Sequence, residues 1–122
     1  MSEKVFEVGK SSAFATQILS FVNSTLRISP DFVDKIEGYY SCDDSLKARQ
    51  DCENAIESGN HRQINSFPKS NNAQHAILCT VLHLGSRQLW CLSIDSSELY
   101  EDMFMYSIWD DEAKEWIYKR EH

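Results

Sequence analysis

The chain has 122 residues, of which 42% are hydrophobic and 25% are charged, and its formal net charge is -7. This length suits a single domain over residues 1–122 with its own core, and the composition excludes a disordered chain. The negative charge argues against nucleic acid or an anionic membrane as a partner, because binding phosphates needs clustered Lys and Arg.

Two segments in the first half have the spacing and end signals of amphipathic helices. Residues 13–26 follow two possible cap residues, Ser11 and Ser12, and their apolar side chains recur every three or four positions. A later helix is expected between the cap residues Asp43 or Asp44 and the stop residue Gly59. Each segment therefore predicts a helix with one apolar face.

The segment between Ser29 and Gly38 predicts a further helix between these two. Ser29 is a good N-cap residue, Pro30 suits a first helical turn, and Gly38 is a natural end. Its expected apolar stripe consists of Phe32, Val33 and Ile36.

From residue 73 onward the pattern becomes that of strands. Residues 73–84 and 87–95 are strand-like, and Gly85-Ser86 between them fits a two-residue hairpin turn. This turn sets a register in which Val81 lies opposite Trp90. Both faces of the hairpin are then apolar.

A second hairpin is expected over residues 103–120, around an acidic turn. A five-residue loop places Ile108 on the face of Trp116 and Tyr118, whereas a four-residue loop places Trp109 there. Either register leaves bulky apolar side chains on both faces of the hairpin.

The order of these elements predicts an α+β fold. We expect three N-terminal helices packed on one face of a C-terminal antiparallel sheet of four or five strands. The other sheet face, which is rich in aromatic residues, would then belong to a curved sheet that closes on itself, form a dimer interface or serve as a binding surface.

The sequence contains no pattern typical of a metal, cofactor or catalytic site. The four cysteines form no C-x-x-C pair, the histidines form no H-x-x-x-H or H-x-E pattern, and no nucleophile-elbow, phosphate-loop or dinucleotide motif is present. We therefore predict no enzyme, no catalytic residues, no metal and no cofactor. The acidic pair Asp110 and Asp111 is explained by a turn role without catalysis.

The cysteines and the lengths of the apolar runs indicate in which cellular compartment the protein is expected. No run approaches the roughly 20 apolar residues of a membrane helix, and the first ten residues lack the apolar core of a signal peptide. The cysteines have apolar or amphipathic neighbours, which suits free thiols in a reducing cytoplasm. In the predicted hairpin, Cys79 and Cys91 point to opposite faces and should not form a disulfide.

The acidic residues are concentrated near the C-terminus. Residues 95–122 hold nine acidic and three basic residues, a net charge of -6, so the first 94 residues carry only about -1. Such charge can simply keep strand edges and turns soluble. It can also match a basic partner, with nearby aromatic residues as anchors. The candidate partner-binding residues are Asp102, Trp109, Asp110, Asp111, Glu112, Glu115 and Trp116.

In size, acidity and lack of a catalytic motif the chain resembles bacterial immunity proteins, which block a cognate toxin. That resemblance implies a cytoplasmic, antitoxin-like inhibitor, a monomer or homodimer, that occludes a basic toxin or nuclease domain. In element order the chain is also similar to proteins of the nuclear-transport-factor-like class. That similarity implies the alternative, a cone-shaped domain for ligand binding or weak catalysis. Its apolar pocket would be lined by Trp90, Leu92, Phe104 and Tyr106.

Overall fold

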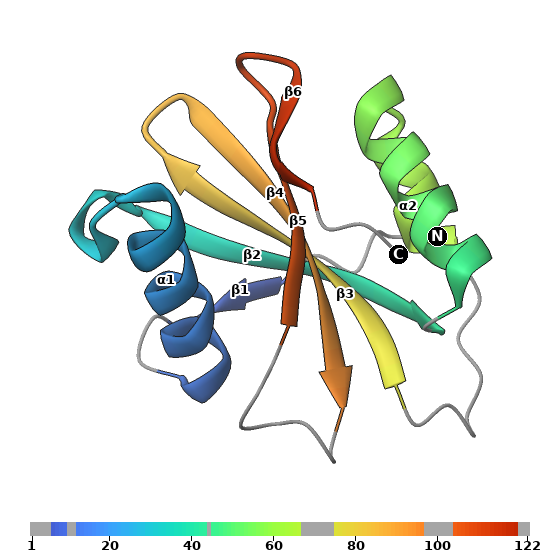
Figure 1. The fold of residues 1–122 in the computed structure, drawn as a ribbon, viewed down its shortest axis with the longest axis horizontal. Helices are drawn as coiled ribbons and strands as arrows, with labels where there is room; N and C mark the ends of the chain where they lie inside the picture. Colours follow the sequence, from blue (N-terminus) through green and yellow to red (C-terminus); the bar gives the residue numbers. More distant parts are fainter. Residues whose placement is uncertain (1–5, 10–11, 44, 67–74, 97–103, 120–122) are drawn as a thin grey trace.

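The computed structural model describes residues 6–9, 12–43, 45–66, 75–96 and 104–119 (Figure 1). These residues form one antiparallel sheet of six strands and two α-helices, which confirms the α+β class. The strands pair in chain order, from β1 to β6. The elements are β1 (Phe6–Val8), α1 (Ala13–Leu26), the short 3-10 helix η1 (Pro30–Phe32), β2 (Lys35–Asp43), α2 (Leu46–Ser58), the 3-10 helix η2 (His61–Ser66), β3 (His75–Leu84), β4 (Arg87–Ser96), β5 (Phe104–Asp110) and β6 (Glu115–Lys119).

Serine residues start both α-helices. The hydroxyl groups of Ser12 and Ser45 accept hydrogen bonds from backbone N–H groups of the first turns, at 3.2 and 3.1 Å. The predicted cap at Asp43 is wrong because Asp43 is the last residue of β2; Asp44 lies outside the described residues. Gly59 ends α2 as expected, with the positive φ that glycine tolerates best.

The helix predicted between Ser29 and Gly38 is wrong. Ser29 does cap a turn, since its hydroxyl group accepts the Asp31 N–H at 3.3 Å, but only η1 is helical and β2 follows. A helix this short is marginal by itself. The strand instead gains two pairing partners, with Ile36 opposite Val8 of β1 and Leu82 of β3. Tertiary pairing therefore overrides the local helix signals.

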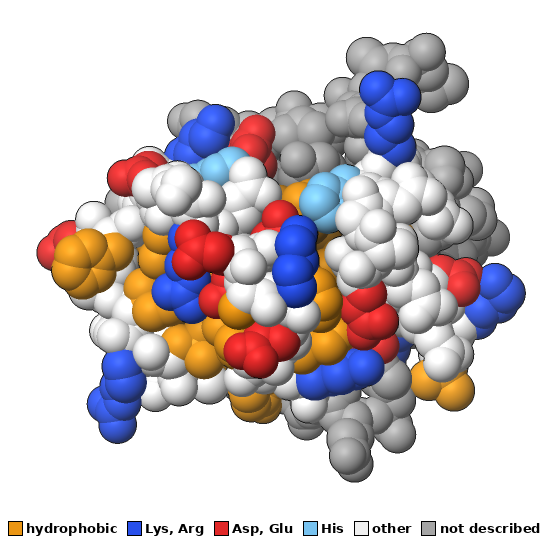
Figure 2. All heavy atoms as spheres, turned by 90° about the horizontal axis from the view of Figure 1, so that it is seen from above, with side chains coloured by type: hydrophobic (Ala, Val, Ile, Leu, Met, Phe, Trp, Pro, Cys, Tyr) orange, Lys and Arg blue, Asp and Glu red, His pale blue; other side chains and the backbone are white. Residues whose placement is uncertain are grey.

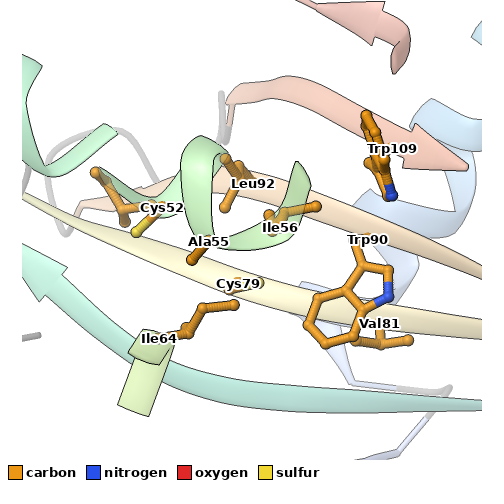
Figure 3. Packing of buried hydrophobic residues seen from close by; sticks show 10 residues of the cluster. Cys52, Ala55, Ile56, Ile64, Cys79, Val81, Trp90, Leu92 and Trp109 are labelled. Atoms are coloured by element: carbon orange, nitrogen blue, oxygen red, sulfur yellow. The ribbon is translucent and has the colours of Figure 1, made fainter. Parts of the chain in front are cut away.

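The two helices cover opposite faces of the sheet, which corrects the prediction that all helices share one face. Val81 and Trp90 belong to a core cluster with Ile56 of α2, whereas their neighbours Leu82 and Leu89 belong to a second cluster with α1. Figure 3 shows the cluster beneath α2. Because successive strand residues point to opposite faces, an apolar hairpin needs a cover on each side.

The predicted register of the β3–β4 hairpin is confirmed. Val81 lies opposite Trp90, and the turn at Gly85-Ser86 joins the strands. Cys79 and Cys91 belong to the two different core clusters, and no disulfide joins them. The turn chemistry was sufficient to set the pairing register of this hairpin.

The β5–β6 hairpin combines both predicted alternatives. Asp110 pairs with Glu115, which leaves a four-residue loop and places Trp109 opposite Trp116. A β-bulge then shifts the register, so that Ile108 lies opposite Tyr118. The bulge therefore sends Trp116 to the α2 face and Tyr118 to the α1 face.

Candidate functional site

The three tryptophans of the chain form a row across β4, β5 and β6. Trp90 pairs with Trp109, and Trp109 pairs with Trp116, so all three lie side by side on the α2 face. The rings of Trp109 and Trp116 meet edge to face, with centroids 5.1 Å apart. Trp90 and Trp109 are 2% and 6% exposed and Trp116 is half-buried, so this tryptophan row runs from the core to the sheet edge.

The acidic turn is the connection between β5 and β6, residues 110–115, and the Asp110 side chain anchors it. Its Oδ2 accepts hydrogen bonds from Nε and Nη2 of Arg87 at 3.1 and 2.8 Å. Its Oδ1 accepts the backbone N–H groups of Glu112 and Ala113 at 3.0 and 3.2 Å. Burial by itself would raise the pKa of Asp110, but these hydrogen bonds and the charge of Arg87 lower it below its usual value. Asp110 is therefore an ionised, buried residue that joins β4 to the turn.

Asp111 holds the next part of the turn. Its backbone N–H donates to the carbonyl oxygen of Gln88 at 3.0 Å. Its Oδ1 accepts from Trp109 Nε1 at 3.3 Å and from Lys114 Nζ at 3.0 Å. The acidic turn is therefore tied both to the tryptophan row and to β4.

The edge of the tryptophan row is bound to α2. Trp116 Nε1 donates to Glu57, and Lys119 Nζ lies 5.5 Å from the centroid of the Trp116 ring. Lys119 Nζ is also 3.8 Å from Oε1 of Glu53, a buried carboxylate that accepts from Ser107 at 3.4 Å. Glu53 and Glu57 were not predicted from the sequence, where their only signal was a shared helix face at positions four apart.

The structure brings six of the seven predicted partner-binding residues together at the β5–β6 hairpin. Glu112 and Glu115 are exposed, and Asp111 and Trp116 are partly exposed. Trp109 and Asp110 are buried, so they position the turn instead of presenting a surface. Asp102 lies outside the described residues. Of the predicted partner-binding residues that the structure describes, only Asp111, Glu112, Glu115 and Trp116 are therefore accessible to a partner.

His61 was not predicted as part of this site. It begins η2, and its ring centroid lies 3.9 Å from that of Trp90, with the rings tilted by 31°. Burial is the main cause that lowers the pKa of His61. The positive charge of Lys114 lowers it further, whereas Asp111 opposes the shift. The folded protein therefore favours the neutral imidazole.

This pKa predicts that acidification weakens the fold. The unfolded chain takes up a proton on His61 near its ordinary pKa of 6.5, but the folded chain resists it. The contribution of the neutral His61 to the free energy of unfolding is therefore complete above about pH 6.5. It is lost as the pH falls through the lowered pKa of the folded state. We expect His61→Phe, which keeps an aromatic ring on Trp90, to show a shallower fall in unfolding free energy between about pH 7.5 and pH 5.5. Urea denaturation across this range measures both slopes, and equal slopes would contradict the assignment.

The part of the chain that the structure describes contains no group of three or more His, Cys, Asp or Glu side chains placed to hold a metal ion. None of the helices in that part has the length and apolar character needed to cross a membrane. Comparisons with protein families, with curated proteins and with solved structures give no significant match to the chain.

Proposed function

We propose that this protein is an inhibitor of a basic protein partner, and specifically a bacterial immunity protein that neutralises a nuclease-like toxin. The observation that carries the proposal is the acidic turn of the β5–β6 hairpin. It presents Glu112 and Glu115 to solvent while Asp110 and Asp111 fix its base. A loop already held in one conformation loses little entropy on binding, which favours affinity.

The proposed mechanism is occlusion. The carboxylates of Asp111, Glu112 and Glu115 would occupy the basic site in which a nuclease holds phosphates. Trp116 would add apolar contact at the rim, and the excess negative charge of the chain would speed the encounter. No chemical step by this chain is needed, so the proposal includes neither a catalytic residue nor a cofactor.

The proposal places the inhibitor in the cytoplasm. Cys52, Cys79 and Cys91 are buried cysteines outside any disulfide, as suits a reducing compartment. The ligand-binding alternative stays a prediction. Two of its four expected pocket residues, Trp90 and Leu92, belong to the core cluster under α2. The side chains of the other two, Phe104 and Tyr106, are outside the described part of the structure.

Charge reversal in the turn tests the proposal. We expect the double variant Glu112→Lys, Glu115→Lys to associate with the partner at least about tenfold more slowly at low salt, because electrostatic steering is lost. The dependence of the association rate on salt should flatten as well. Stopped-flow mixing at several salt concentrations measures both effects. The probe is the basic protein that co-purifies with the unaltered chain from the cells that make it.

A matched control separates the turn from the net charge. Asp51→Lys makes a charge reversal on α2, where Asp51 forms an exposed ion pair with Lys47. Such surface pairs contribute little to stability. Combined with Gln50→Lys and Asn54→Lys at two other exposed α2 positions, it raises the net charge by as much as the turn variant does and should leave most of the steering intact. If the turn variant and this control slow association equally, the turn is not the contact.

A further inference from the structure

Phe32 stands out among the exposed side chains of the described structure. It is 69% exposed, and the other large hydrophobic side chain in this state is Leu46, at 62%. The sequence pattern placed Phe32 in the apolar stripe of a helix, yet only Val33 and Ile36 of that stripe are buried. A single exposed apolar side chain is common, so its surroundings decide whether it has a role.

The backbone holds Phe32 outward in a fixed turn. Its N–H donates to the Ser29 carbonyl oxygen at 3.0 Å, and the Val33 N–H donates to that of Pro30 at 3.1 Å. Pro30 has a fixed φ, and the buried side chain of Val33 anchors the turn to the core. An aromatic ring on such a support costs little conformational entropy when it is buried by a partner.

Hydrogen bonds connect this turn to the end of the sheet that carries the acidic turn. The Asp34 N–H donates to the carbonyl oxygen of His83 at 2.7 Å, and Asp34 Oδ2 accepts the Gly85 N–H at 2.7 Å. Two residues beyond Gly85, Arg87 binds Asp110. Three segments that are distant in sequence therefore lie at one end of the sheet. Figure 2 looks onto this end and shows charged side chains with hydrophobic ones exposed between them.

The charges at the end of the sheet that carries η1 and the acidic turn indicate the kind of partner. Close to Phe32 in the chain, the acidic Asp31 and Asp34 and the basic Arg27 and Lys35 are all exposed, so their charges balance. The excess negative charge of this end lies on the β5–β6 hairpin, where Glu112 and Glu115 are exposed. Two basic side chains near the acidic turn, Arg87 and Lys114, are already paired with carboxylates. A second copy of the chain, also at -7, would be repelled, as would nucleic acid. A basic protein surface is the complement.

We infer that Phe32 is the apolar anchor of the contact surface and that the partner offers an apolar pocket bordered by Lys or Arg side chains. This extends the proposed function, on which it rests, from the acidic turn to a footprint that also includes η1. Aromatic residues surrounded by groups of lesser energetic weight are the usual centres of such interfaces. The acidic side chains would guide the encounter, and Phe32 would hold the complex together.

The chain offers a matched pair of variants. Phe32→Ala and Leu46→Ala each remove a side chain of similar exposure, so neither should impair folding. Leu46 begins α2, which follows the far end of β2. The nine residues of β2 span about 30 Å, which puts Leu46 well away from η1. Thermal unfolding of both variants checks that they remain folded.

The test measures binding to the co-purified basic protein by surface plasmon resonance at several salt concentrations. We expect Phe32→Ala to raise the dissociation constant about 10- to 100-fold, chiefly through faster dissociation and with an unchanged salt dependence. Leu46→Ala should change it less than about twofold. This pattern differs from that of the charge-reversal variant, which acts on association.

The outcomes separate the inference from the function on which it rests. If Phe32→Ala binds like Leu46→Ala while the charge-reversal variant is impaired, the proposed function stands and the Phe32 anchor is overturned. If the unaltered chain yields no basic partner, both are overturned. A variant Phe32→Leu that recovers part of the affinity would support burial of this side chain in an apolar pocket.

Discussion

Replacing Asp110 with alanine is expected to lower the free energy of unfolding by about 2 kcal/mol, because it removes a buried carboxylate that accepts several hydrogen bonds, while its partner Arg87 keeps access to water. The change removes the acceptor of two Arg87 hydrogen bonds and leaves the N–H groups of Glu112 and Ala113 without their side-chain acceptor. Urea denaturation at neutral pH measures the loss. A loss below about 0.5 kcal/mol, typical of a surface substitution, would show that Asp110 is not structural.

Asp110→Asn provides the control. An asparagine oxygen can still accept the N–H groups of the turn, but it lacks the charge that pairs with Arg87, so an intermediate loss is expected. The lowered pKa of Asp110 adds a pH test. Its stabilising contribution is present above about pH 4, the ordinary carboxyl pKa, and is lost as the pH falls through the lower folded value. Both variants should lack this part of the acid sensitivity.

Truncation of the tryptophan row is expected to produce a gradient of destabilisation. Trp90→Ala should cost about 4 kcal/mol, because it opens a cavity between α2 and the sheet and removes the ring on which His61 lies. Trp116→Ala at the half-buried edge should cost about 1 to 2 kcal/mol, since water can fill part of the space. Chemical denaturation of the two variants measures the difference. Equal losses would mean that the edge is packed as tightly as the centre.

The two tryptophan variants also test the proposed function. If Trp116 contacts the partner, Trp116→Ala should weaken binding by more than its modest effect on stability accounts for. Trp90→Ala should weaken binding only to the extent that it unfolds the protein. Measuring affinity at a temperature at which both variants remain folded separates the two effects.

The parts of the fold that were predicted correctly are those fixed by neighbouring residues. The turn at Gly85-Ser86 determines the register of β3 and β4, because a two-residue loop permits few pairings. The starts of α1 and α2 follow from serine caps, and the end of α2 follows from Gly59, although Ser45 took the place of Asp43. Local chemistry sufficed wherever the interacting groups are close in the chain.

The parts that were missed depend on contacts distant in sequence. The cap signal at Ser29 is real, since the turn forms, but the pairing of β2 with the distant β3 makes the next segment a strand. β1 has three residues, too few to show a strand pattern. The acidic pair at the hairpin was correctly assigned a turn role, yet its partner Arg87 is 23 residues away. The bond between Trp116 and Glu57 spans 59 residues.

The bulge in the β5–β6 pairing has a consequence for the behaviour of the protein at high concentration. β6 is the last strand of the described sheet, with one neighbour, and an open strand edge is a template for unwanted growth of the sheet. This edge is five residues long, is bent by the bulge, and ends at the charged side chain of Lys119. Short length, a bend and a lysine are three devices by which natural proteins prevent a second molecule from adding its own strand. The β-bulge that places Trp116 and Tyr118 on opposite faces of the sheet thus also protects the chain against fibril-like self-association.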